Sequence, residues 1–233
     1  MGEDFSRYVR QTSIEEIGHE GQKKLSQSKV FVVGCGALGS MVSMQIAGAG
    51  VGTIGIADFD TIDHTNLQRQ FFFRDDEAGR GKARILEEKI KGLNPETIVN
   101  VFNELVTEKR GDDVLKDYDV IVDATDNQSS KLMIDKICEV LAIPMVTAGV
   151  ASFHGQATTI LPGQERYSEL FSDIKEETFL PCSLGGVMGP AAALCASIQS
   201  SEVIKIITGA GDTLSGKLFV FDLLSNSFTL YSL

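Results

Sequence analysis

The stretch that decides the fold runs Val30-Phe31-Val32-Val33-Gly34-Cys35-Gly36-Ala37-Leu38-Gly39. Its first four residues form an apolar run of strand length, which suits a buried parallel strand. The pattern Gly-x-Gly-x-x-Gly follows, and the small apolar residues after it predict a helix at about 38–49. Glycines between a strand and a helix let backbone N–H groups approach a phosphate at the helix N-terminus. The stretch therefore favours a nucleotide site over the alternative, a turn whose glycines serve only helix–sheet packing.

Outward from this stretch, strands and helices alternate along the chain. Strands are expected at 53–57, near 98–102, at 119–123 and at 144–148. Helices are expected at about 13–27, 79–92 and 128–141. Strand alternating with helix at this spacing is typical of βαβ units. The sequence therefore predicts a Rossmann-like α/β fold with a doubly wound, mainly parallel sheet.

The regular alternation of strands and helices ends after residue 150. A segment at 155–161 alternates like an exposed strand, and residues 162–182 are polar and irregular. Pro190 and Gly209 bound a long helix, because proline suits a helix start and glycine a helix end. Short strands near 217–221 and 226–231 are expected to extend the sheet with antiparallel C-terminal edges.

Length and charge limit the classes of protein that this chain can represent. Its 233 residues can build one good-sized core, so we expect a single domain over 1–233. That domain is divided into an N-terminal helix at 1–28, a nucleotide-binding core at 29–150 and a C-terminal part at 151–233. The net charge of −11 argues against a nucleic-acid partner and against an anionic membrane surface. No apolar run is expected to span a bilayer, and the acidic start carries no secretory signal, so a cytoplasmic location is expected.

The cysteines and histidines predict no metal site of their own. The four cysteines form no Cys-x-x-Cys pair, and the three histidines are scattered along the chain. We therefore expect reduced thiols and no structural zinc. Cys35, Cys138 and Cys195 fall on glycine-loop or helical positions and are interpreted as packing residues.

A carboxylate and a basic segment follow the glycine stretch. Asp58 ends the second strand 24 residues after Gly34, where a carboxylate can accept hydrogen bonds from ribose hydroxyls. Residues 69–84 carry five basic side chains against three acids, which suggests that a polyanion is held there. The alternative, a solvated helix face of mixed charge, is the default for Arg74, Arg80 and Arg84.

Several motifs now occur in a fixed order. They are Arg7-Tyr8-x-Arg10-Gln11, the glycine stretch, Asp58-Phe59-Asp60, Asn66-Leu67-Gln68-Arg69-Gln70, Lys82 and Thr125-Asp126-Asn127. In this order the chain resembles the ThiF, MoeB and HesA proteins, bacterial relatives of ubiquitin-activating enzymes, and among them the ThiF type. The resemblance covers nearly the whole chain, and the combination is far more specific than any single motif.

The resemblance implies an activity and partners. It implies an ATP-dependent adenylyltransferase that activates the C-terminal glycine of a small ubiquitin-like sulfur carrier ending in Gly-Gly, with release of pyrophosphate. The carrier would be ThiS-like or MoaD-like, serving thiamine or molybdopterin synthesis. A homodimer is implied, and a sulfur-donor protein is a further candidate partner.

The resemblance also implies roles for single residues. Backbone at Gly34, Gly36, Ala37 and Gly39 would line the phosphates, and Asp58 would hold the ribose with Asp60 close by. Asn66, Arg69 and Lys82 would contact the triphosphate, Asp126 would hold Mg²⁺, and Asn127 would lie near the adenine. Arg10 resembles an arginine lent to the partner subunit's site. Fixed cations and a magnesium ion suit this chemistry, because negative charge builds on both phosphate groups as pyrophosphate leaves.

Cys182 and a few departures from the pattern leave questions open. Cys182 resembles a cysteine that ThiF-like proteins carry in a crossover segment for sulfur transfer or a covalent link to the carrier. A small structural cysteine is the alternative. Lys131 stands where the family often has arginine, and Thr65 stands in place of serine. Phe71-Phe72-Phe73 is interpreted as core packing rather than as a carrier-docking patch.

Three other functions compete with the implied one. An enzyme that adenylates another carboxylate, such as a dehydratase acting on modified transfer RNA, is disfavoured by the acidic charge. A catalytically silent scaffold is disfavoured by the intact Arg69, Lys82 and Asp126. An NAD-linked oxidoreductase is disfavoured by the basic segment and by the little chain left for a catalytic domain.

Overall fold

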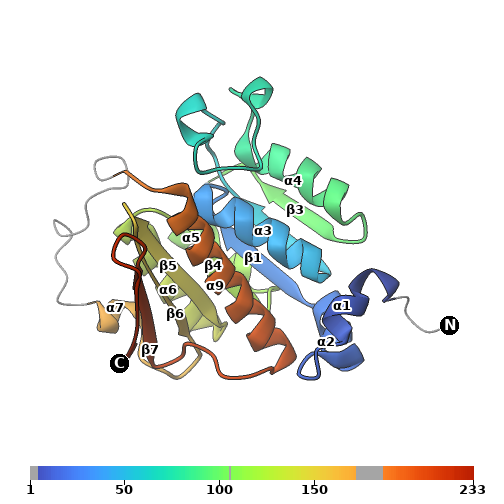
Figure 1. Ribbon diagram of the computed structural model, residues 1–233, viewed down its shortest axis with the longest axis vertical. Coiled ribbons are helices and arrows are strands. Elements are labelled where there is room, and N and C mark those ends of the chain that lie inside the picture. Colours follow the sequence, from blue (N-terminus) through green and yellow to red (C-terminus); the bar gives the residue numbers. More distant parts are fainter. Residues whose placement is uncertain (1–4, 105, 172–185) are drawn as a thin grey trace.

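The computed structural model describes residues 5–104, 106–171 and 186–233. Their centre is an eight-stranded sheet in the order β3-β2-β1-β4-β5-β6-β7-β8 (Figure 1). The strands are β1 Lys29–Val33, β2 Thr53–Ala57, β3 Ile98–Phe102, β4 Val120–Asp123, β5 Met145–Ala151, β6 His154–Ile160, β7 Lys217–Asp222 and β8 Ser227–Ser232. β1 to β5 pair in parallel with one another, and β6, β7 and β8 follow as antiparallel neighbours, each paired with the strand before it. The predicted fold class is confirmed.

Helices cover both faces of the parallel strands (Figure 1). One face carries α3 Ala37–Ala49, α4 Lys82–Leu93 and α9 Gly189–Thr208, and the other carries α5 Glu108–Leu115 and α6 Gln128–Leu141. Shorter elements are η1 Ser6–Tyr8, α1 Val9–Thr12, α2 Gly18–Gln27, η2 His64–Asn66, η3 Asp75–Glu77 and α7 Tyr167–Leu170. This double cover is the arrangement expected of a doubly wound sheet.

The apolar run of β1 supplies both cores. Val30 and Val32 belong to the cluster beneath α3, α4 and α9, whereas Phe31 and Val33 belong to the cluster beneath α5 and α6. Successive side chains of a strand point to opposite faces of its sheet, so a strand covered on both sides must be apolar throughout. This requirement explains why the opening stretch is a continuous apolar run.

Three segments differ from the sequence prediction. The helix expected at 13–27 begins only at Gly18, as α2, because residues 13–17 form a turn after the separate helix α1; Gly18 has a φ of +55°. The helix expected from residue 79 begins at Lys82, because Gly81 forms a bridge with Thr61 and precedes the helix as its N-cap. α5 was not predicted, since this short and highly charged helix buries only Gly111 and Leu115.

The expectation that no apolar run could span a bilayer is wrong by length and composition. α9 has 20 residues and is apolar enough to pass that test. Half of its most apolar window is nevertheless buried inside the fold, where α9 packs on α3 and on β5. A central helix of a globular core has the same composition, so α9 is weak support for a membrane span.

Candidate nucleotide site

A cavity of about 900 Å³ opens at the carboxyl ends of the parallel strands. The strand order reverses between β1 and β4, which is where open α/β sheets form their ligand crevice. Ten of the residues singled out in the sequence line it: Gly34, Gly36, Ala37, Asp58, Asp60, Asn66, Arg69, Lys82, Asp126 and Asn127. The structure therefore brings together side chains that lie up to 93 positions apart in the sequence.

The glycines of the loop divide into two kinds. Gly34 has a φ of +94°, and Gly36 is the N-cap of α3; both line the cavity. Gly39 lies behind them, where an added Cβ would come within 1.8 Å of the Gly34 carbonyl oxygen. Gly39 therefore lets α3 pack against the loop and does not itself face the cavity.

Asp58 fixes the geometry of the loop from the end of β2. Its Oδ2 accepts a hydrogen bond from the Cys35 N–H at 2.6 Å, and its Oδ1 accepts one from the Asp60 N–H at 2.8 Å. Burial raises the pKa of Asp58, and these two N–H groups partly oppose that shift. The carboxylate is thus held in place beside the phosphate loop, where a ribose could bind.

Lys82 is a buried cation in the first turn of α4. Its side chain is 7% exposed and its Nζ lies 3.0 Å from Asp60 Oδ2. A cation in this position opposes the helix macrodipole, because the helix N-terminus already carries partial positive charge. Helix stability does not explain Lys82, whereas an anionic ligand in the cavity would.

Arg69 differs from the other arginines of the basic segment. Arg74, Arg80 and Arg84 are exposed, and each pairs with a surface carboxylate. Arg69 is half-buried, lines the cavity and donates from Nη1 to the Thr65 carbonyl at 2.9 Å. Within the described part of the chain, no carboxylate lies within ion-pair distance of Arg69. The polyanion interpretation therefore remains a prediction for Arg69 and Lys82, whereas the exposed ion pairs of the other three arginines fit the solvated-face interpretation.

The turn that carries Arg69 is held by its own polar groups. The Asp63 carboxylate accepts hydrogen bonds from the N–H and the hydroxyl of Thr65, at 2.8 and 2.6 Å. In return, Asn66 Oδ1 accepts a hydrogen bond from the Asp63 N–H at 3.2 Å. Thr65 thus keeps the hydroxyl that serine would supply, and this hydroxyl stabilises the turn. The Asn66 side chain also stabilises the turn through its hydrogen bond with the Asp63 N–H.

A buried polar cluster that the sequence did not reveal lies below the cavity. Asp123 Oδ2 accepts from Lys131 Nζ and from Thr147 Oγ1, both at 2.6 Å. Asp123 Oδ1 accepts from the hydroxyl and the N–H of Thr125, at 2.6 and 3.1 Å. Lys131 also donates to the Ala148 carbonyl at 2.8 Å. The cluster fixes the loop after β4 to β5 and α6. The only sequence signal for it was lysine at a position where related proteins often have arginine.

Asp126 and Asn127 lie on that fixed loop. Asn127 Oδ1 caps α6 by accepting from the Ser130 N–H at 2.9 Å. Asp126 is exposed in the cavity, and among the described residues its carboxylate has one weak partner, the Asn127 side-chain amide at 3.5 Å. Its lone pairs are thus available to a cation. Among the described residues no group of three carboxylate, thiol or imidazole ligands forms a metal cage.

The charges around the cavity do not favour a free polyanion. The lining carboxylates are Asp58, Asp60, Glu104 and Asp126, and the lining cations are Arg69, Lys82 and Lys131. Lys131 is already paired with Asp123 and Lys82 with Asp60. A triphosphate would therefore need further positive charge, such as a divalent cation bound by Asp126, since Mg²⁺ commonly uses one carboxylate together with phosphates and waters.

One candidate residue lies away from the cavity, and another is outside the described residues. Arg10 is exposed on α1, and its neighbour Gln11 donates to the Ala49 carbonyl at the last residue of α3. The cavity lies at the first residue of this 13-residue helix, so Arg10 is on the order of 20 Å away. Cys182 lies outside the described residues. Cys35, Cys138 and Cys195 are buried as expected, and burial raises the pKa of each thiol.

The far end of the cavity was not predicted. It is formed by the second half of β5 and by the antiparallel strands β6 and β7, and its lining includes Gly149, Ala151, His154, Gln156, Thr158, Leu218 and Val220. These side chains are small, neutral or apolar, apart from His154. This end therefore suits a slender uncharged group better than a phosphate.

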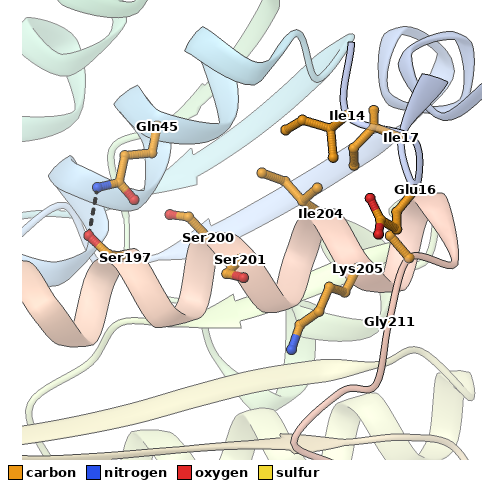
Figure 2. A pocket seen from close by; sticks show the side chains of 11 residues that line it. Ile14, Glu16, Ile17, Gln45, Ser197, Ser200, Ser201, Ile204, Lys205 and Gly211 are labelled. Atoms are coloured by element: carbon orange, nitrogen blue, oxygen red, sulfur yellow. Dashed lines mark hydrogen bonds between the residues drawn. The ribbon is translucent and has the colours of Figure 1, made fainter. Parts of the chain in front are cut away.

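A second pocket contains none of the candidate residues. It measures about 450 Å³ and is bordered by three parts of the chain: the segment before α2, the helix α3 and the helix α9 (Figure 2). Ile14, Ile17 and Ile204 face it together with several serines, and Gln45 donates to Ser197 Oγ at 3.0 Å (Figure 2). Its single cation, Lys205, pairs with Glu202. This pocket has no feature of a nucleotide site.

Comparison with known proteins identifies related chains. The profile of the ThiF family matches residues 8–233. A Mycobacterium tuberculosis protein named probable adenylyltransferase/sulfurtransferase MoeZ is 36% identical over 97% of this chain and 59% of its own length. The Escherichia coli sulfur carrier protein ThiS adenylyltransferase is 34% identical over 94% of this chain and 87% of its own. This chain thus spans about three-fifths of the MoeZ protein and most of the ThiS adenylyltransferase.

Solved structures show the same fold. The crystal structure of Escherichia coli MccB with ATP superimposes with a TM-score of 0.85 at 23% identity, covering 98% of this chain and 72% of that one. The structure of PaaA superimposes with a TM-score of 0.84 at 25% identity, covering 100% of this chain and 84% of that one. In both alignments the shared architecture extends over nearly all of this chain.

Proposed function

This chain belongs to the ThiF family, and on that premise we propose that it is an ATP-dependent adenylyltransferase. Its substrate would be the C-terminal glycine carboxylate of a small ubiquitin-like sulfur carrier, in thiamine or molybdopterin synthesis. Arg69 supports this proposal most directly, because it lines the cavity that also holds the glycine loop and Asp58, and it has no carboxylate partner among the described residues. The names of the relatives support the choice of a sulfur carrier.

The reaction requires stabilisation of charge rather than proton transfer. A carboxylate oxygen attacks the α-phosphorus, a new P–O bond forms, and the bond to the β-phosphate breaks with release of pyrophosphate. The attacking carboxylate is already ionised at neutral pH, so no general base is needed. The barrier is lowered by fixed donors and cations placed where negative charge develops.

Each part of the cavity has a role in that step. N–H groups at Gly36 and the start of α3 would hold phosphate oxygens, and Asp58 would accept from the ribose hydroxyls. Arg69 and Lys82 would neutralise the departing pyrophosphate. Lys82 would also gain from such a ligand, since it is buried and Asp60 is its only carboxylate partner among the described residues.

Magnesium fits the polar end of the cavity. Asp126 would bind the ion, because its carboxylate is exposed there and almost unpartnered. A bound Mg²⁺ would supply charge neutralisation on the phosphates. The excess of lining carboxylates over lining cations supports the proposal of such an ion.

The neutral end of the cavity would receive the carrier tail. A Gly-Gly terminus has no side chains, and the lining at Gly149 and Ala151 leaves room for a thin extended chain. Arg10 would act from the partner subunit of a homodimer, since it is far from the cavity of its own chain. Cys182 would act after the adenylate has formed, together with a sulfur-donor protein. We place the reaction in the cytoplasm.

Carrier-dependent exchange of pyrophosphate into ATP tests this function. Exchange that requires a carrier ending in Gly-Gly supports it, and Arg69→Ala should lower the rate by roughly 100- to 1,000-fold. Arg84→Ala is the matched control, because Arg84 is exposed and pairs with Glu87 on the surface. Asp126→Ala should abolish exchange, whereas Cys182→Ala should preserve it. If no Gly-Gly carrier stimulates exchange, the function is wrong.

A further inference from the structure

The segment that carries Arg10 depends on polar contacts for its position. It contains α1, a helix of four residues, none of which is buried. A helix this short is not stable by itself, because its few hydrogen bonds do not offset the entropy lost in forming the first turn. Arg10 is exposed on α1, and no carboxylate of the described residues lies within ion-pair distance of it. The contacts of its neighbours therefore determine where its guanidinium lies.

Gln11 ties α1 to the C-terminal end of α3 (Figure 1). Its Nε2 donates to Gln22 Oε1 at 2.6 Å and to the Ala49 carbonyl at 2.9 Å. Gln22 is fully buried, and its own Nε2 donates to the same carbonyl at 3.0 Å. Ala49 is the last residue of α3, where carbonyl groups lack a partner within the helix. The two glutamines thus satisfy this helix end and fix α1 beside it.

Tyr8 supplies a second anchor, directly before α1. It is 6% exposed, and its hydroxyl oxygen accepts from Asn94 Nδ2 at 2.7 Å. Asn94 is the C-cap of α4, and the same amide nitrogen donates to the Ala47 carbonyl at 2.9 Å. The contact is close, because a Cβ added to Gly50 would lie 2.7 Å from the Tyr8 ring. Tyr8 thereby fixes the start of α1 against the ends of both α3 and α4.

Stability alone does not explain why these anchors are polar. Replacing both partners of a buried hydrogen bond by apolar groups of the same shape is often nearly neutral for stability. Hydrogen bonds add a fixed direction, which apolar contacts lack. A charge that acts on a ligand needs such a mount, since it has to be held within about 0.5 Å of its working position. The polar anchors therefore suit a helix whose exposed side chain has to reach one fixed point.

We propose that Gln11, Tyr8 and Asn94 are positioning residues for Arg10, which they present to the nucleotide cavity of a second copy of this chain. The inference rests on the proposed function, because it takes Arg10 to act in the partner subunit's cavity. α1 is fixed at the last residue of α3, whereas its own cavity lies at the first residue of that helix. In the partner's cavity, a guanidinium held in one place adds positive charge where lining carboxylates outnumber lining cations.

Mixed dimers separate positioning from a structural role. Co-expression with two affinity tags gives dimers of one Arg69→Ala protomer, whose cavity is impaired, and one Arg10→Ala protomer, which lends no arginine. One of the two sites is then complete, so exchange of labelled pyrophosphate into ATP should reach about half of the wild-type rate. The carrier in this assay is the Gly-Gly-ended protein that supports exchange by the wild type.

Gln11→Leu is then added to one protomer at a time. In the Arg69→Ala protomer, which lends Arg10, it should lower exchange by roughly 10- to 100-fold, because a displacement of about 1 Å can cost that much. In the Arg10→Ala protomer it should lower exchange no further. A merely structural role would lower the rate by the same factor in either protomer.

Tyr8→Phe repeats the test with the loss of a single hydroxyl. Exchange should fall several-fold, the range for one hydrogen bond, and only when the protomer that lends Arg10 carries the substitution. Tyr118→Phe is the matched control. Tyr118 is 7% exposed, and its hydroxyl oxygen also accepts from an asparagine amide, Asn100 Nδ2 at 3.1 Å, but it belongs to the core beneath α5 and α6. This control should leave the rate unchanged in either protomer.

Each possible result leads to a different conclusion. A wild type that exchanges no pyrophosphate with any Gly-Gly-ended carrier would overturn the proposed function together with this inference. If the wild type is active but monomeric, or if the mixed dimers are as inactive as their parents, only the inference is wrong. Equal losses from the two protomers would also overturn it, by assigning Gln11 a structural role. If Gln11→Leu does not fold, Tyr8→Phe decides alone: a loss confined to the protomer that lends Arg10 supports the inference, and any other result excludes it.

Discussion

The parallel and antiparallel halves of the sheet differ in how far their strands are buried. All four residues of β4 and four of the five in β1 are buried, whereas all six residues of β8 are exposed. Helices cover both faces of the parallel half, whereas β8 is the edge strand of the described sheet and pairs with β7 alone among the described strands. Phe228, Leu230 and Tyr231 of β8 remain 52–55% exposed.

This difference determines where chemistry can be built. A buried strand tolerates a polar side chain only if its hydrogen bonds are satisfied, and Asp123 at the end of β4 makes four of them. Such a group holds its neighbours in one geometry, which a catalytic site needs. The candidate phosphate-binding residues accordingly follow the parallel strands, and the antiparallel strands contribute only the neutral end of the cavity.

The substitution with the largest expected effect on stability removes the carboxylate of Asp123, in the buried half of the sheet. Asp123→Ala leaves Lys131 as an unpaired buried cation, so the free energy of unfolding should fall by about 3–5 kcal/mol. Urea unfolding measures this loss. Asp113→Ala is the control, because it removes a highly exposed partner of Lys116 and should change stability little.

Replacing both members of the buried pair sharpens that test. Asp123→Leu combined with Lys131→Met removes both charges, so it should recover much of the stability lost in Asp123→Ala. Carrier-dependent exchange should stay low in the double variant, because the loop that carries Asp126 loses its anchor at Thr125. If Asp123→Ala unfolds as readily as the wild type, the buried cluster does not stabilise the parallel half.

Two glycines of one loop provide a smaller test within the parallel half. Gly39→Ala places a Cβ 1.8 Å from a backbone oxygen, so stability should fall by about 1–3 kcal/mol. Gly36→Ala meets no atom closer than 3.7 Å, so stability should change little while the affinity for ATP decreases. Thermal melting and calorimetric titration measure the two effects. A stable Gly39→Ala variant would contradict the packing role of Gly39.

The same contrast explains how much of the fold the sequence could predict. β1 and β2 were placed to within one residue, because an apolar run of strand length that is followed by Gly34 or by Asp58 allows few other structures. α5 was missed, since eight mostly charged residues with two buried positions resemble a surface loop. Local patterning thus predicts the elements that the core constrains from both sides, and it predicts weakly those that touch the core at one or two points.

The site follows a similar rule. The sequence could single out Gly34, Asp58 and Arg69, which line one cavity, because each belongs to a motif that is local in the chain; their roles remain predictions. The pairing of Asp123 with Lys131 and Thr147 was not found, because it depends on the register between β4 and β5. The role of Gly39 also changed, since only the path of the backbone shows that it faces the Gly34 carbonyl and not the cavity.

A pH titration of ATP binding tests the buried setting of Asp58. Burial raises its pKa, so Asp58 takes up a proton at a higher pH than an exposed aspartate does. The protonated form is a poorer acceptor for ribose hydroxyls, so the affinity for ATP should fall several-fold as the pH decreases through that raised pKa. The wild type should therefore lose affinity between about pH 7 and about pH 4 more steeply than Asp58→Asn, which cannot titrate. Parallel profiles would show that Asp58 does not contact the nucleotide.

Replacing Leu230 has the smallest expected effect on stability, and it tests the exposed, antiparallel half of the sheet. Its side chain is 54% exposed on β8, so Leu230→Ala should change the free energy of unfolding by about 0.5 kcal/mol or less. Urea unfolding at several protein concentrations is the measurement, because burial against another molecule would make the loss depend on concentration. A loss of about 2 kcal/mol that grows with concentration would mean that this edge is covered in solution. The difference in burial between the two halves of the sheet would then hold for the single chain and not for its assembled form. A small change that does not depend on concentration would show that β8 is as exposed in solution as it is in the structure.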